Sequence, residues 1–97
     1  MRIFTTVHAE PRDSVDHPTY RVNFWQQPQP DFGWNLEAFV VVDAGDVNEA
    51  IFWAEQNSRG RPYELFAEIS DENVEGTERP RQSGLIRLLG KDPNSRI

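Results

Sequence analysis

Apolar and polar residues alternate in five short runs, and this two-residue period is typical of β-strands with one buried face. In the second run, for example, Tyr20, Val22 and Phe24 are separated by single residues that belong to the other face. The runs are also rich in β-branched and aromatic residues, which favour strands. The predicted strands are residues 3–9, 20–25, 36–43, 63–70 and 85–89.

One segment has the longer period of an amphipathic helix. Asp46 can cap the first turn, Glu49 follows it at the capping-box position, and Gly60 and Pro62 provide a stop. These signals predict a helix that starts after Asp46 and ends before Gly60. Its core-facing stripe consists of Val47, Ala50, Ile51 and Ala54.

The predicted order of elements is therefore β-β-β-α-β-β. A single helix covers only one face of a sheet, so the expected fold class is α+β, a mostly antiparallel five-stranded sheet with one helix packed on one face. The strand 36–43 is apolar on both faces, which predicts a central position. If the strands before and after the helix run parallel, the crossover is expected to be right-handed. The predicted organisation is one domain over residues 1–90 and a flexible tail over residues 91–97.

The second face of this sheet is predicted to carry large aromatic side chains. Trp25, Phe39 and Phe66 each have the opposite parity to the core residues of their own strand, and Phe4 joins them if Ile3 and Val7 face inward. An exposed apolar patch of this kind often marks an interface. The predicted polar rim around it consists of Arg21, Asn23, Glu37, Glu64, Glu68 and Arg87.

Three explanations of this aromatic face are open. The loop 26–35, which carries Phe32 and Trp34, or the loop 71–82 folds back over the rings. Alternatively, the face binds a partner protein or a second copy of the chain. The third explanation is a concave ligand site.

Two further aromatic features are candidates for binding. Phe52 lies opposite the core stripe of the helix and has no obvious internal partner, so it is a second candidate contact with another chain. Trp34 lies in a loop rich in aromatic and amide side chains, a composition used to stack on sugars or to clasp a peptide. The same composition also fits a loop that its aromatics pin to the domain.

Chemistry-bearing residues are sparse. His8 and His17 flank three acidic residues, but their spacing matches no metal motif, so no metal, cofactor or catalytic set is predicted. The 97 residues are enough for one core and include no cysteine, which excludes disulfides and thiol chemistry. No apolar run is long enough to cross a membrane, and a cytoplasmic location is the expectation.

The charge distribution bears on possible partners. The formal net charge is -6, most of the acidic residues lie in the stretch 43–78, and residues 79–97 are net basic. An acidic middle repels phosphate backbones, so a nucleic-acid partner is not expected unless the basic C-terminal segment acts alone. A membrane is not expected as a partner either, because no long apolar run is present.

These patterns lead to two hypotheses of function. The first is a non-catalytic cytoplasmic interaction module, either a homodimer or an inhibitor or immunity-like protein, that uses the aromatic face formed by Trp25, Phe39 and Phe66. The second is a small-molecule-binding domain or small enzyme with a site between the sheet and the loop 26–35. That site would use His8, His17 or Trp34.

Overall fold

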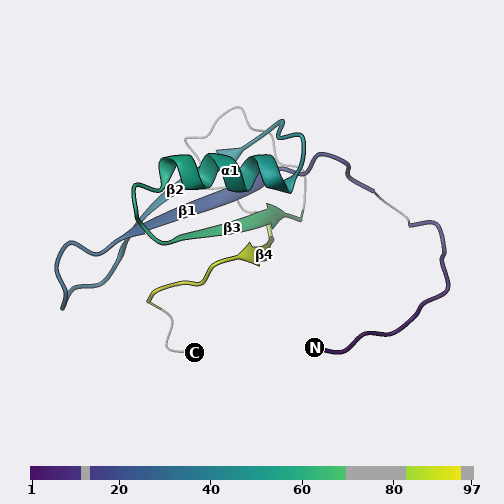
Figure 1. The fold of residues 1–97 in the computed structure, drawn as a ribbon, viewed down its shortest axis with the longest axis horizontal. Coiled ribbons are helices and arrows are strands. Elements are labelled where there is room, and N and C mark those ends of the chain that lie inside the picture. Colours follow the sequence, from purple (N-terminus) through teal and green to yellow (C-terminus); the bar gives the residue numbers. More distant parts are fainter. Residues whose placement is uncertain (12–13, 70–82, 95–97) are drawn as a thin grey trace.

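Four strands and one helix form the fold in a computed structural model that describes residues 1–11, 14–69 and 83–94 (Figure 1). The elements in chain order are β1 (Tyr20–Gln26), β2 (Asn35–Val41), α1 (Val47–Asn57), β3 (Tyr63–Glu68) and β4 (Leu85–Leu89). The strand order in the sheet is β2-β1-β3-β4, and all neighbours are antiparallel. Because β2 and β3 are both antiparallel to β1, they run in the same direction on either side of it. The α+β class and the antiparallel sheet were predicted; the number of strands was not.

The prediction of five strands is wrong, because residues 3–9 form no strand. Residues 1–11 are exposed and lie apart from the sheet (Figure 1). An alternating sequence becomes a strand only when an edge supplies hydrogen-bond partners. β1, which follows this segment in the chain, already has a strand on each side. Residues 3–9 would therefore have to reach an outer edge of the sheet.

The prediction that the strand 36–43 lies in the centre of the sheet is also wrong. This strand is β2, it ends at Val41, and it occupies an edge, whereas β1 is central. Apolar residues on both faces indicate burial in a central strand, but here most of β2 is exposed. The strand predicted over 63–70 ends at Glu68, and position 70 lies outside the described residues, as does the predicted loop 71–82.

The helix follows its local sequence signals. The Asp46 carboxylate accepts a hydrogen bond from the Glu49 amide at 3.0 Å, and the Glu49 carboxylate accepts one from the Gly45 amide at 2.8 Å. The helix ends at Asn57, and Arg59 and Gly60 then adopt positive φ angles. Both the predicted start and the predicted stop are thus confirmed.

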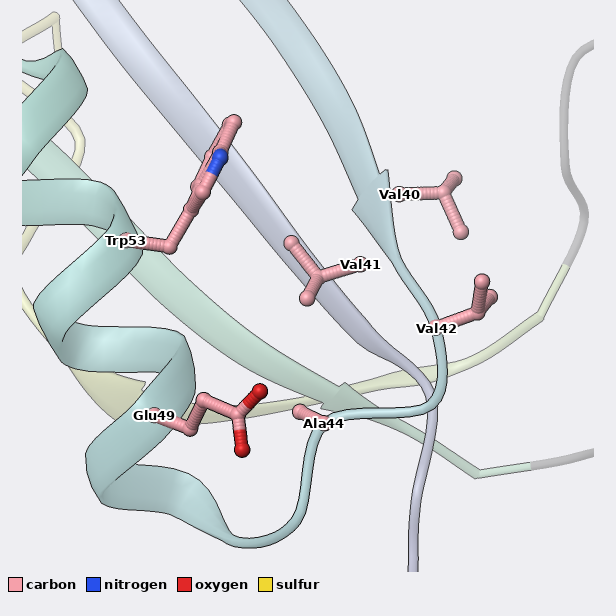
Figure 2. A pocket seen from close by; sticks show the side chains of 6 residues that line it. All are labelled: Val40, Val41, Val42, Ala44, Glu49 and Trp53. Atoms are coloured by element: carbon pink, nitrogen blue, oxygen red, sulfur yellow. The ribbon is translucent and has the colours of Figure 1, made fainter.

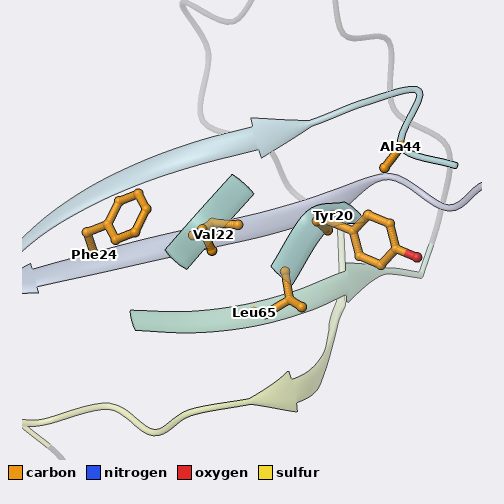
Figure 3. Packing of buried hydrophobic residues seen from close by; sticks show 7 residues of the cluster. Tyr20, Val22, Phe24, Ala44 and Leu65 are labelled. Carbon is orange, nitrogen blue, oxygen red and sulfur yellow. The ribbon is translucent and has the colours of Figure 1, made fainter. Parts of the chain in front are cut away.

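The core lies between α1 and one face of the sheet (Figure 3). Ala50 and Ala54 of the predicted stripe are fully buried, and Val47 and Ile51 pack beside them. Small side chains on the helix let it approach the sheet closely, so larger sheet residues fill the layer. The buried members of this core are Tyr20, Val22, Phe24, Ala44, Ala50, Ala54 and Leu65.

Phe39 lies on the helix side of the sheet, so its predicted position on the opposite face is wrong. It pairs across the sheet with Val22, and its ring lies 5.6 Å from the ring of Phe24 and 5.3 Å from that of Trp53. The residues of β2 that were predicted to face away from the helix therefore face toward it. Glu37 has the same parity as Phe39, so it does not belong to the predicted polar rim on the opposite face. A strand with apolar residues at both parities does not define its inward face.

No helix among the described residues is long and apolar enough to cross a membrane.

Candidate functional site

Trp25 and Phe66 lie on the predicted face, opposite α1, but they are buried. Each is 8% exposed within the single chain. The Arg87 guanidinium stacks over the Phe66 ring at 4.8 Å from its centroid, and the Trp25 indole is held by the carboxylate of Glu64. This face therefore offers little of these two rings to a partner.

Glu64 is the centre of a polar network on this face. Its side chain is 2% exposed, and the Trp25 indole N–H donates to its Oε1 at 2.6 Å. The Asn23 amide donates to the same oxygen at 3.3 Å, and Arg87 lies 2.6 Å from Oε2. A buried carboxylate is tolerated when it is paired and hydrogen-bonded in this way. The network joins β1, β3 and β4, and it engages both carboxylate oxygens, so it fits a structural role better than catalysis.

The sequence predicted Glu64 as an exposed rim residue. Its three partners come from β1 and β4, which are distant in the chain, and only the strand order and register bring them together. The sequence signal for such a network is a Glu on one strand with Trp and Arg on the same face of neighbouring strands. This signal can be recognised only when the strand pairing is known.

A pocket of about 380 Å³ opens where β2 ends beside α1 (Figure 2). The side chains of Val41, Ala44 and Trp53 lie between the strand and the helix, and Glu49 reaches in from the first turn of α1. Val40 and Val42 point away from the helix, as the alternation of a strand requires. The lining is therefore mainly apolar, with one acidic group.

The outer edge of β2 borders this pocket. Within the part of the chain that the structure describes, β2 pairs with β1 alone, so its other edge presents unpaired backbone groups. Leu36 and Phe39 of the strand and Val42 just after it remain substantially exposed. Such an edge is a template for pairing with another strand. Four acidic residues lie on β2 or in the segment that leads from it into α1, namely Glu37, Asp43, Asp46 and Glu49, and Glu37 is paired with Arg61 at 3.7 Å.

The remaining predicted site residues are dispersed. The Trp34 backbone amide donates to the Asn94 side-chain oxygen at 3.2 Å, and the Asn94 side-chain amide donates to the Trp34 carbonyl at 3.4 Å. These hydrogen bonds hold the loop 26–35 to the segment that follows β4. Gln27 closes the same loop by donating to the carbonyls of Pro30 and Phe32. Phe52 is 64% exposed on the outer side of α1. The loop 26–35 joins β2 at the end opposite the pocket, so these residues do not form one site.

The two histidines contact different parts of the chain and do not form one site. His8 lies in the exposed N-terminal segment, 3.6 Å from Glu10, whereas the ring of His17 contacts the Gly45 carbonyl at 3.2 Å. Among residues 1–11, 14–69 and 83–94, no group of three potential ligands is arranged to hold a metal ion.

Comparison with protein-family models, with curated proteins and with solved structures found no significant match to this chain.

Proposed function

We propose that this chain is a non-catalytic protein-interaction module that binds an extended segment of a partner at the outer edge of β2. The observation that carries the proposal is the seven-residue outer edge of β2, which pairs with no strand of residues 1–11, 14–69 and 83–94 and lies beside an apolar pocket. In this mode, backbone hydrogen bonds provide affinity, and pockets for alternate side chains provide specificity. The predicted aromatic face is a weaker candidate for binding a partner, because Trp25 and Phe66 are buried.

The chemistry around β2 narrows the class of partner. The pocket favours an apolar side chain, and the acidic residues Asp43 and Glu49 favour a basic residue nearby. The partner segment is therefore extended, alternates apolar and polar residues, and carries a positive charge. A cytoplasmic location, expected from the sequence, belongs to the same proposal.

A small-molecule site in the pocket is the weaker alternative. Its volume lies at the small end of the range for ligand pockets. However, ligand sites also have several converging polar groups, whereas the only charged side chain in this lining, Glu49, already bonds the Gly45 amide. This lining suits an apolar side chain of a peptide better.

The proposal is tested with a panel of synthetic seven-residue peptides that alternate valine and threonine, with and without one arginine. Binding is measured by amide hydrogen exchange and by two-dimensional NMR of the labelled protein. We expect slower exchange and shifted resonances in β2 and at Trp53, because strand addition protects the edge amides. The peptide with arginine is expected to bind more tightly, and added salt is expected to reduce that difference.

Two lysine substitutions serve as matched variants. Val42→Lys puts a charge at the pocket and on the exposed end of the edge, which should weaken binding at least about tenfold. Ile86→Lys makes a similar change on the exposed edge strand β4 and should leave binding unchanged. Equal loss in both variants, or peptide-induced shifts confined to β4 or to Phe52, would contradict the proposal.

A further inference from the structure

The N-terminal segment has the composition of a strand but no partner in its own sheet. Residues 3–9 alternate in the β pattern, and Ile3, Phe4 and Val7 are 81%, 73% and 91% exposed. Thr6 contacts the adjacent Val7 carbonyl. We call residues 2–9 the arm. Exposed large apolar residues on an extended segment indicate a contact that the isolated chain does not make.

From these observations we infer that the arm of one copy adds as a fifth strand to the β2 edge of a second copy. The inference rests on the proposed function, and it names the partner segment. The predicted strand in the arm has seven residues, as has β2. Its alternating apolar side chains fit the extended, apolar class of segment that the pocket favours. Reciprocal exchange between two copies makes a closed symmetric dimer.

Charge complementarity supports β2 as the receiving edge. The arm carries Arg2 and no acidic residue, whereas Asp43 and Glu49 lie close to the end of β2, and Glu37 within β2 is already paired with Arg61 at 3.7 Å. The other edge strand, β4, has no acidic residue of its own to attract Arg2, and its Arg87 is already paired with Glu64. Attraction between Arg2 and the acidic groups beside β2 therefore favours the β2 edge over β4.

The geometry of the two edges leads to the same choice. β4 has five residues, and its pairing with β3 shifts register between Leu65 and Phe66. Irregularities of this kind twist an edge away from further pairing. The pairing of β2 with β1 runs through seven consecutive residue pairs without a shift. An incoming strand therefore has a longer and more regular template at β2.

The direction of the arm favours a second copy over the arm's own domain. The chain leads away from the start of β1 and then turns back, so that the arm lies apart from the sheet (Figure 1). β1 has β2 on one side and β3 on the other, so an arm that returned to its own β2 edge would have to cross the end of β2 or pass over it. A neighbouring copy receives the arm without that crossing.

The test compares two proline variants of the full chain by sedimentation over a range of concentrations. Thr5→Pro interrupts the centre of the arm, where a proline removes a backbone donor. We expect the dissociation constant of the dimer to rise at least about tenfold. Ser14→Pro places the same residue in the exposed linker outside the predicted strand and should leave the dimer unchanged. Folding of both variants is checked by tryptophan fluorescence.

A synthetic peptide of residues 1–11 is then added to the monomeric Thr5→Pro protein. We expect it to slow hydrogen exchange in β2, and we expect Val42→Lys introduced into the same protein to abolish this effect. The inference would be overturned if the wild-type chain stays monomeric. This holds whether the amide hydrogens of β2 exchange freely or are already protected by the chain's own arm. A dimer that survives Thr5→Pro would overturn it as well.

The outcomes separate this inference from the proposed function. If other extended peptides protect β2 but the peptide of residues 1–11 does not, the second copy is the wrong partner and the β2 site stands. If no extended peptide protects β2, both the site and the inference fail.

Discussion

Glu64 illustrates how a single residue can change its role between sequence and structure. On a strand with period two, its parity predicts an outward, solvated carboxylate. In the structure, Trp25, Asn23 and Arg87 converge on it from neighbouring strands, and the group is buried. The carboxylate therefore links three strands on the face that the helix does not cover.

The network predicts an asymmetry between its two charged partners. Arg87 is 43% exposed, so Glu64→Gln leaves a cation that water can solvate. Arg87→Leu instead leaves a buried carboxylate without its counter-ion. We expect Arg87→Leu to cost about 3 kcal/mol and Glu64→Gln about 1 kcal/mol. Urea unfolding monitored by tryptophan fluorescence measures both.

The double variant Glu64→Gln/Arg87→Leu completes the thermodynamic cycle. It should be more stable than Arg87→Leu alone, because the unpaired buried charge is gone. Strictly additive effects would show that the two side chains do not interact.

The helix and the edge strand differ in how far their positions depend on residues nearby in the sequence. The start of α1 depends on Asp46 and Glu49, which act within one turn, and it was predictable. The position of β2 depends on which strands pair, and its apolar residues at both parities were consistent with a central strand. Its edge position decides that it can receive another strand.

The end of β4 supports a prediction about glycine. Gly90 has φ +86°, and a Cβ there would overlap the backbone carbonyl of Tyr63. Gly60 has φ +76° but nothing within 4 Å of the same position. Gly60→Ala should cost about 1 kcal/mol for the left-handed conformation. Gly90→Ala should cost a further 1–3 kcal/mol, roughly, because the backbone must also move.

Thermal unfolding of the two alanine variants tests this difference. Gly60→Ala is the control for the conformational cost that both positions share. Equal losses of stability would mean that the end of β4 moves freely away from β3.

The molecule as a whole is more extended than a compact chain of its length, and the arm lies outside its sheet and helix layers. The radius of gyration is 15.8 Å, whereas a compact chain of this size has about 12.5 Å. In the proposal, the strand-like arm and the outer edge of β2, which has no partner strand among the described residues, are the two halves of one interface. The proposed dimer would bring them together.

The stability of the whole fold is expected to fall in alkali. Burial, and secondarily the charge of Asp46, raises the pKa of Tyr20 above its ordinary value of 10.0. Burial, followed by interactions with Glu55, raises the pKa of Tyr63 in the same direction. A raised folded-state pKa means that the stabilisation is complete below about pH 10 and is lost as the pH rises through the folded-state pKa.

Urea unfolding at about pH 8 and about pH 11 measures this loss. The variant Tyr20→Phe/Tyr63→Phe has no phenol at either position and should lose less stability over the same interval. An identical decline in the variant would assign the alkaline effect to other groups.

Local sequence by itself determined the helix with its cap and stop, its core stripe, and the strand character of the runs that became β1 to β4. These features depend on neighbours a few residues apart, which propensity and periodicity describe well. The same pattern in residues 3–9 produced no strand, because pairing requires an edge that only the assembled sheet can offer.

Only the tertiary structure decided the strand order, the inward face of β2, the burial of Glu64 and the location of the pocket. Each depends on which distant segments become neighbours, and a shift of one residue in register reverses every side chain of a strand. Phe39 therefore lies on the helix side of the sheet, and Trp25 and Phe66 are buried on the other side, so the proposed binding surface is the edge of β2 and not the aromatic face.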